Sequence, residues 1–267
     1  MKKNETNKIE KTRRLGRADL HIHSKYSDGR PSIEEILDYV ENHTRLDVIA
    51  ITDHDTIEGA LVAQAIMKTK KYRFELIVGE EVTSKEGHIL GLYLKEAIPA
   101  GLPTHLVLKK IHEQDGIAIA SHPFMHTRWR NPNIRLMDGV GLFTLIKEKA
   151  GFNAIEIVNA TPTLQKVNLQ ASFINHTLLF CGETGSSDAH IVEAIGRGYT
   201  LFEGKTAADL KRALRYHQTK AEYGNWSFLA LYDYLFFFIP KGFRMAIHTL
   251  LHGRTPERPQ IVNIPEK

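Results

Sequence analysis

The feature that most constrains this chain is a regular alternation of short apolar runs with longer segments of helical periodicity. Apolar runs of strand length occur at residues 18–23, 47–52, 74–79, 88–94, 117–121, 154–158, 178–182 and 199–202. Helical patterns occupy most of the intervals, at residues 32–42, 56–69, 104–114, 143–151, 162–175 and 206–216. Strands that alternate with helices are typical of parallel sheets built from βαβ units. With seven or eight strands, we expect an α/β fold whose sheet closes, or nearly closes, into a barrel.

The size and composition fit one barrel-sized domain with an appendage at each end. The chain has 267 residues, of which 42% are hydrophobic and 25% charged, so it can bury a large core. We expect a basic, disordered tail at residues 1–14, the barrel at 15–220 and an aromatic-rich, helical C-terminal appendage at 221–267. Because the N-terminus lacks an apolar core and Cys181 is the single cysteine, we expect a cytoplasmic protein without a secretory signal or an internal disulfide.

The net charge of +4 is concentrated in the N-terminal tail. Residues 1–17 carry seven Lys or Arg and two Glu, a net charge of +5, which leaves −1 for the other 250 residues. The body of the protein is therefore not expected to be a basic, nucleic-acid-binding surface. The tail itself is a candidate arm for anionic lipid or nucleic acid, which would make the protein membrane-peripheral in the first case.

Side chains that bind metals are concentrated where the predicted strands end. Because they are two residues apart in a strand, His21 and His23 point to the same face. In β/α barrels the C-terminal ends of the strands converge on the face that carries the active site. His88 precedes its apolar run, so the turn before that run would have to present it. The residues at or just past the ends of five predicted strands are His21 and His23; Asp53, His54 and Asp55; Glu80 and Glu81; His122; and Asp188 and His190.

This set predicts a centre with several metal ions. Six histidines and three or four carboxylates exceed the four ligands of a single tetrahedral zinc ion, and they suit two or three ions that share bridging carboxylates. Such clusters activate a water molecule and bind the oxygens of a phosphoryl group. The sequence has no glycine-rich phosphate loop and no GxSxG motif, and Cys181 lies in an apolar run typical of the core.

Six motifs, HIHSKYSDG, ITDHDTIEGA, GEEVTS, GHILGL, SHP and GSSDAH, stand in the order and spacing of one known family. On these motifs the chain resembles the free-standing phosphoesterases of the PHP (polymerase and histidinol phosphatase) family, over residues 18–215. The resemblance implies a distorted seven-stranded, TIM-like (β/α)7 barrel with a trinuclear centre of manganese, iron or zinc. It implies three ligand sets, which are His21, His23, Glu81 and Asp188; Glu81, His88 and His122; and Asp28, His54 and His190.

A centre of this kind predicts metal-dependent hydrolysis of a phosphoester in a small phosphorylated metabolite or nucleotide. Within enzymes, the alternatives are a 5′–3′ exonuclease acting on short RNA or DNA and a phosphatase of phosphotyrosine or histidinol phosphate. The alternative outside enzymes is a module that binds a phosphorylated ligand, or docks on a membrane, without turnover. The complete set of metal positions favours the enzyme.

Four further residues are candidates for a direct part in the reaction. Asp53 and Asp55 are placed to orient histidine N–H groups, although Asp55 is equally suited to cap the helix that begins near residue 56. Arg128 and Arg130 follow the SHP motif in a loop that should border the site, and arginine suits bidentate contact with phosphate. An ordinary solvated loop is the alternative for both. Asn159 follows its strand and is a candidate either for the site or for a turn.

The C-terminal appendage contains a run of mostly apolar residues at 226–239, with Asp233 in the middle. The run is shorter than the roughly 20 residues that cross a bilayer. We expect it to pack on the barrel wall or to form a homodimer contact. The alternative is a peripheral position in a membrane interface, which would suit its aromatic side chains and the basic residues that follow, Lys241, Arg244, Arg254 and Arg258.

Overall fold

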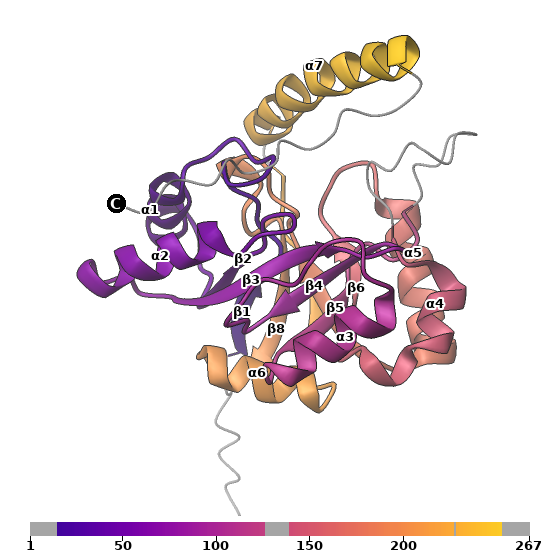
Figure 1. Ribbon diagram of the computed structural model, residues 1–267. Coiled ribbons are helices and arrows are strands. Elements are labelled where there is room, and N and C mark those ends of the chain that lie inside the picture. Colours follow the sequence, from indigo (N-terminus) through magenta and orange to yellow (C-terminus); the bar gives the residue numbers. More distant parts are fainter. Residues whose placement is uncertain (1–14, 126–138, 227, 253–267) are drawn as a thin grey trace, which may run out of the picture.

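The computed structural model describes residues 15–125, 139–226 and 228–252, which form a barrel-like α/β fold with one long helix standing off it (Figure 1). The predictions for the tail at 1–14 and for Arg128 and Arg130 lie outside these residues. One sheet contains nine strands in the order β7-β6-β5-β4-β3-β2-β1-β8-β9. The strands are β1 (Leu15–Asp19), β2 (Val48–Ile51), β3 (Glu75–Thr83), β4 (His88–Leu92), β5 (Ile117–Ala120), β6 (Ala154–Asn159), β7 (Gly182–Ser186), β8 (Gly198–Glu203) and β9 (Lys220–Tyr223).

The predicted α/β barrel class is confirmed, but the sheet has nine strands rather than seven and is mixed rather than parallel. β1, β2 and β3 pair in parallel, as do β5, β6 and β7. β4 runs antiparallel to both β3 and β5. The reason is the short connection at residues 84–87, since a parallel crossover needs a dozen residues or more. β8 and β9 are also antiparallel to their neighbours.

The barrel closes between the segments that follow β1 and β7. Ile22 forms a parallel bridge with Ala189, and the His23 N–H donates to the Ala189 carbonyl at 2.9 Å. On the same side of the barrel, Gly198 at the start of β8 lies so close to β7 that a Cβ would overlap the carbonyl of Ser186. Closure therefore requires a residue without a side chain at this position.

Helices cover the outside of the sheet (Figure 1). Ser32 begins the first of them with a capping box, because its Oγ accepts from the Glu35 N–H at 3.2 Å while its own N–H donates to Glu35 Oε2 at 2.7 Å. Every residue of β2, β5 and β6 is buried, as expected for strands covered on both faces. The helices of the barrel are α1 (Ile33–His43), α2 (Glu58–Thr69), α3 (Thr104–Glu113), α4 (Gly141–Lys147), α5 (Gln165–Ile174) and α6 (Ala207–Arg215).

The predicted strand at residues 178–182 is wrong. Helix α5 continues into a π-helical turn at Asn175–Leu179, which ends at Phe180 with a left-handed φ of 56°. The Asn175 side chain bonds both the N–H and the carbonyl of Cys181, at 3.0 and 3.1 Å, so these groups are not available to a strand ladder. β7 begins only at Gly182, and its sequence, GETGS, has no apolar residue to indicate a strand.

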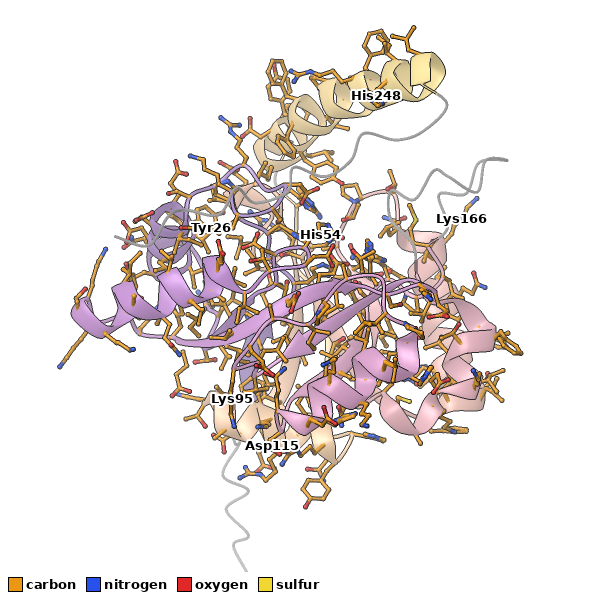
Figure 2. The ribbon with its side chains drawn as sticks, in the orientation of Figure 1. Tyr26, His54, Lys95, Asp115, Lys166 and His248 are labelled. Atoms are coloured by element: carbon orange, nitrogen blue, oxygen red, sulfur yellow. The ribbon has the colours of Figure 1, made fainter. Side chains whose placement is uncertain are left out.

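The C-terminal helix α7 (Phe228–His252) is attached by its first turns (Figure 2). Trp226 Nε1 donates to the Ala160 carbonyl at 3.1 Å, and Ala230 and Tyr234 are buried. Phe236 is 69% exposed, so the expected burial of the aromatic run on the barrel holds for only part of it. Among the described residues, no helix combines the length and apolarity needed to cross a membrane.

Candidate metal centre

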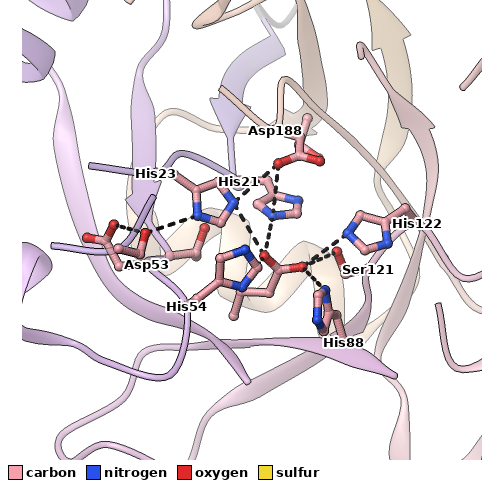
Figure 3. A network of polar contacts seen from close by, with 12 residues as sticks. His21, His23, Asp53, His54, His88, Ser121, His122 and Asp188 are labelled. Atoms are coloured by element: carbon pink, nitrogen blue, oxygen red, sulfur yellow. Dashed lines mark hydrogen bonds and ion pairs between the residues drawn. The ribbon is translucent and has the colours of Figure 1, made fainter. Parts of the chain in front are cut away.

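Glu81 of β3 lies among several histidines, of which His21, His23, His54, His88 and His122 are labelled in Figure 3. Its side chain is fully buried, and five imidazole nitrogens lie 3.0–3.3 Å from its two oxygens. A carboxylate whose oxygens face different sets of histidines has the arrangement of a bridging ligand. Oε2 faces His21, His23 and His54, and Oε1 faces His88 and His122.

Two aspartates border this histidine cluster, and each lies 3.1–3.8 Å from both His23 and His190. Asp188 Oδ1 lies 3.2 Å from His23 Nε2, and Asp28 Oδ1 lies 3.1 Å from His190 Nε2. The two aspartates differ in access to solvent, since the Asp188 side chain is 3% exposed and the Asp28 side chain is 33% exposed. The site is therefore enclosed at Asp188 and open at Asp28.

The structure brings all nine ligand residues implied by the family resemblance into overlapping groups. Within each group, one nitrogen or oxygen of every residue lies within 4.8 Å of the others. The groups differ from the implied ligand sets in two ways. His23 also belongs to the group of Asp28, His54 and His190, and His88 and His122 lie in different groups. The groups are His23, Asp28, His54 and His190; His21, His122 and Asp188; His21, His23 and Glu81; and His54, Glu81 and His88.

His88 reaches the site because β4 runs antiparallel to β3. It pairs with Thr83, so the N-terminal end of β4 lies beside the C-terminal end of β3. A residue that begins an antiparallel strand therefore meets residues that end the parallel ones. This pairing explains a ligand that precedes its apolar run.

Buried atoms without hydrogen bonds show that the residues fit metal ions. His21 Nε2, His23 Nε2, His88 Nδ1 and Glu81 Oε2 are buried and form no hydrogen bond among the described residues. Leaving a buried polar atom unsatisfied costs about 1–3 kcal/mol. Imidazole nitrogens and carboxylate oxygens are ligands of zinc, iron and manganese, so divalent ions would satisfy all four atoms.

The electrostatics of the site also favour bound cations. Burial alone would raise the pKa of Glu81, but the imidazoles of His54 and His21 hold it well below its usual value. Burial would lower the pKa of His23, and the nearby carboxylates of Asp188 and Glu81 instead raise it to about 9. The buried carboxylates thus stay ionised and need positive charge beside them, which protons on the histidines or metal ions can supply.

Glu156 of β6 is a functional residue that the sequence analysis missed. It is fully buried, and its Oε1 accepts from His21 Nδ1 at 3.0 Å. Its Oε2 accepts from the His122 N–H at 2.8 Å and from Asn159 Nδ2 at 3.0 Å. With its Nδ1 proton held by Glu156, His21 presents Nε2 to the cluster. The available signal was a lone acidic residue between the apolar residues of β6.

Asn159 bonds a carboxylate of the site directly, and Asp53 contacts the site through a serine. Asn159 Nδ2 also donates to Asp188 Oδ2 at 3.0 Å, and Asn159 Oδ1 accepts from the Thr161 N–H at 3.0 Å, so this residue contacts the site and also forms the turn after β6. Asp53 Oδ1 accepts from Ser27 Oγ at 2.6 Å, and that hydroxyl lies 3.5 Å from His23 Nδ1. Asp53 therefore acts on a histidine through a serine.

Asp55 bonds to β3. Its carboxylate accepts from the Thr83 N–H at 2.6 Å and from Thr83 Oγ1 at 2.8 Å. Helix α2 has Ile57 as its N-cap, with no side-chain cap bond. The contacts that Arg128 and Arg130 make lie outside the described residues, so their role in phosphate binding stays a prediction.

Three residues at or beside the site have backbone conformations that residues other than glycine rarely adopt. The φ angle is 55° at Asp55, 26° at His122 and 52° at Asp188. Such conformations cost about 1–3 kcal/mol each and persist only where the surroundings determine them, which happens most often at functional sites.

Comparison with known sequences gives three matches that bear on this site. The family model described as PHP-associated matches residues 180–219. An uncharacterized protein of Methanocaldococcus jannaschii is 41% identical over 118 residues, which cover 40% of this chain and 68% of that protein. The phosphoribosyl 1,2-cyclic phosphate 1,2-diphosphodiesterase of Eggerthella lenta is 32% identical over 88 residues, which cover 31% of this chain and 32% of that enzyme.

Two solved structures share the fold. A two-domain protein of Bacteroides vulgatus containing a predicted PHP-like metal-dependent phosphoesterase superposes with a TM-score of 0.60 at 18% identity, over 79% of this chain and 65% of that one. The lesion-specific endonuclease Q of Pyrococcus furiosus superposes with a TM-score of 0.52 at 15% identity, over 78% of this chain and 58% of that one. The chain spans less than two thirds of either protein.

Proposed function

This chain belongs to the PHP (polymerase and histidinol phosphatase) family, and from this premise we propose that it is a metal-dependent phosphatase of a small phosphorylated metabolite or nucleotide. The observation that carries the proposal is the convergence of six histidines with Asp28, Glu81 and Asp188 in overlapping groups at one end of the barrel. Such a cluster, open on one side, suits a phosphoryl group. The diphosphodiesterase of Eggerthella lenta, which matches part of the chain, supports chemistry on phosphoesters.

The residues of the site take separate roles in this proposal. Divalent ions, of which we propose three, would supply Lewis-acid activation of a water molecule and of the phosphoryl oxygens. Glu81 presents its two oxygens to different histidines, so it would bridge neighbouring ions. Glu156 keeps the His21 proton on Nδ1, which leaves Nε2 for a metal. Asp28 and His190 stand at the more exposed end, where a substrate phosphate would enter.

Charge favours a small substrate over a long nucleic acid. Residues 18–267 carry a net charge of −1, whereas proteins that bind a nucleic-acid backbone present basic surfaces. A nuclease that acts on short strands is the second candidate, because endonuclease Q shares the fold.

The test is a substrate panel with metal reconstitution. Protein that has been stripped with chelator and reloaded with manganese is assayed on nucleoside mono- and bisphosphates, short oligonucleotides, phosphotyrosine and histidinol phosphate. We expect turnover of a small phosphate ester by the reloaded protein and none by the stripped protein. Preferential cleavage of oligonucleotides would favour the nuclease, and binding without any turnover would contradict both.

Two variants connect the activity to the metal centre. His54→Ala and Asp188→Ala should lower both the metal content, measured by elemental analysis, and kcat. Asp38→Ala is the control, because this residue is exposed on α1 and should change neither quantity. Full activity in metal-free protein would contradict the proposed mechanism.

A further inference from the structure

Helix α7, which stands off the barrel in Figure 1, carries a stripe of exposed apolar side chains along its length. The residues of this α7 stripe recur every three or four positions, or at twice that interval, which keeps them on one side of a helix. All six are more than half exposed, between 57% and 83%. They are Phe228, Tyr232, Phe236, Ile239, Phe243 and Leu251.

The stripe is not the side by which α7 is attached to the barrel. Ala230 is 1% exposed and Tyr234 is 7% exposed, and the Tyr234 ring packs edge-on against Trp226, with centroids 5.4 Å apart. The barrel thus contacts a different side of the helix. A row of exposed aromatic side chains of this length marks an interaction surface.

The length and charge of α7 fit a helix that lies in a membrane surface. Its 25 residues make it about 37 Å long. The helix is too polar to cross a bilayer. It contains Asp233, Lys241 and Arg244, a net charge of +1, and two histidines. Interfacial helices combine an apolar, aromatic face with basic residues, and they bind anionic lipid through both.

Charge complementarity favours an anionic membrane over a second copy of the chain. Two α7 helices paired in the same direction would bring the exposed Arg244 of one copy beside that of the other, with Asp233 as the one acidic residue in each helix. Asp233 faces the barrel, where it lines a pocket with Arg30, Glu35 and Glu193. A surface of anionic lipids would instead offer many negative groups to the exposed Arg244.

We propose that α7 docks this protein on an anionic lipid membrane, with the α7 stripe immersed at the boundary between headgroups and acyl chains. The attachment of α7 gives this docking a direction. Trp226 bonds the carbonyl of Ala160, whose neighbour Asn159 donates to Asp188 of the metal centre. The docked helix therefore holds the Asp188 side of the metal centre toward the lipid headgroups.

The test is co-sedimentation of the metal-loaded, full-length protein with phosphatidylcholine vesicles, with and without phosphatidylserine. We expect binding that phosphatidylserine strengthens. The double variant Phe236→Glu/Phe243→Glu puts two charges into the α7 stripe and should weaken binding about tenfold or more. Arg244→Ser should weaken binding only to the anionic vesicles, by roughly fivefold, since one basic residue near such a surface contributes about 1 kcal/mol.

Phe143→Glu is the matched control, because Phe143 is 81% exposed on α4, away from the stripe. This variant should bind vesicles like the wild type, and near-ultraviolet circular dichroism should show that all variants are folded. Hydrolysis of a soluble phosphate ester should be unchanged in each variant, which separates docking from the proposed catalysis. The proposal is overturned if the wild type does not sediment with anionic vesicles, or if Phe143→Glu loses binding and the double variant keeps it. A dimer that only the double variant dissociates, without vesicle binding, would assign the stripe to a second copy.

Discussion

Replacing Glu156 with Gln tests the part of the site that is most fully determined by hydrogen bonds. Its two oxygens accept four bonds, from His21 Nδ1, Ser186 Oγ, the His122 N–H and Asn159 Nδ2. Glutamine keeps the shape but has one accepting oxygen and an NH2 group. Whichever way the amide turns, its NH2 faces groups that donate, in a position with no access to solvent.

In either orientation of the glutamine, one hydrogen bond that Glu156 makes to a histidine residue is lost. An NH2 group facing His21 would move the imidazole proton to Nε2, the nitrogen that faces Glu81 and Asp188. An NH2 group facing His122 would leave a buried backbone N–H unpaired. A hydrogen bond to a charged group contributes about 1.5–3 kcal/mol, which corresponds to roughly 10- to 150-fold in an equilibrium constant. Loss of a group that orients a metal ligand typically lowers metal affinity 10–100-fold. We therefore expect the metal affinity of Glu156→Gln to be lower than that of the wild type by a factor in this range.

The assay is titration of chelator-stripped protein with a divalent metal against a competing indicator. Glu183→Gln is the matched control, because Glu183 also bonds a histidine, His176 Nε2 at 2.6 Å, but outside the site. Thermal unfolding in chelator shows whether the variants are folded. Equal metal affinity in the wild type and in a folded Glu156→Gln protein would refute the argument that Glu156 fixes the tautomer of His21.

Further predictions concern pH and the loop after β5. Burial raises the pKa of Glu80 from 4.5 to about 8, so the folded state keeps a proton that the unfolded state loses. The free energy of unfolding should therefore fall between pH 5 and 8, by at most about 1.4 kcal/mol per pH unit. In Glu80→Gln, the free energy of unfolding measured with denaturant should change less with pH. If it changes with pH as much as in the wild type, this prediction is wrong. Because the pKa of His23 is raised to about 9, metal binding at pH 7 should release protons, and the metal affinity should increase as pH rises. Calorimetry in buffers of different ionisation enthalpy measures the number of protons released. If Arg128 and Arg130 bind the substrate phosphate, Ala at either should lower kcat/KM by about 1–3 kcal/mol at constant metal content; unchanged kinetics would assign both to a solvated loop.

The sequence was sufficient to predict where most site residues lie, because the end of a buried strand is marked both by an apolar run and by the polar residues that follow it. An apolar run such as 48–51 marks a buried strand, and a polar residue directly after it, such as His54, must lie at the strand's C-terminal end. In a barrel this end is shared by all parallel strands, so residues far apart in the chain can be placed together without knowledge of their contacts. Glu81, buried among five histidines, is the clearest outcome.

The features that could not be predicted depend on tertiary contacts without a local signal. The direction of β4, and so the position of His88, follows from a hairpin between two apolar runs that periodicity alone does not orient. The GETGS strand is held by its neighbours rather than by its own propensity, with Thr200 Oγ1 donating to the Gly185 carbonyl at 2.9 Å. Glu156 was missed because its role depends on an imidazole, a backbone amide and a hydroxyl from three other segments.

The left-handed backbone at His122 and Asp188 means that selection for stability and selection for function oppose each other at these positions. Glycine would adopt these φ angles without strain, so a change such as Asp188→Gly would relieve about 1–3 kcal/mol of strain while deleting a metal-binding group. Selection for stability alone would favour such a change only where the relieved strain exceeds the lost contacts of Asp188 with Asn159 and His23. Bound metal opposes this drift, since a ligand that binds only the folded state adds RT ln(1 + [L]/Kd) to its stability. Metal bound at the proposed centre would therefore favour the retention of both residues.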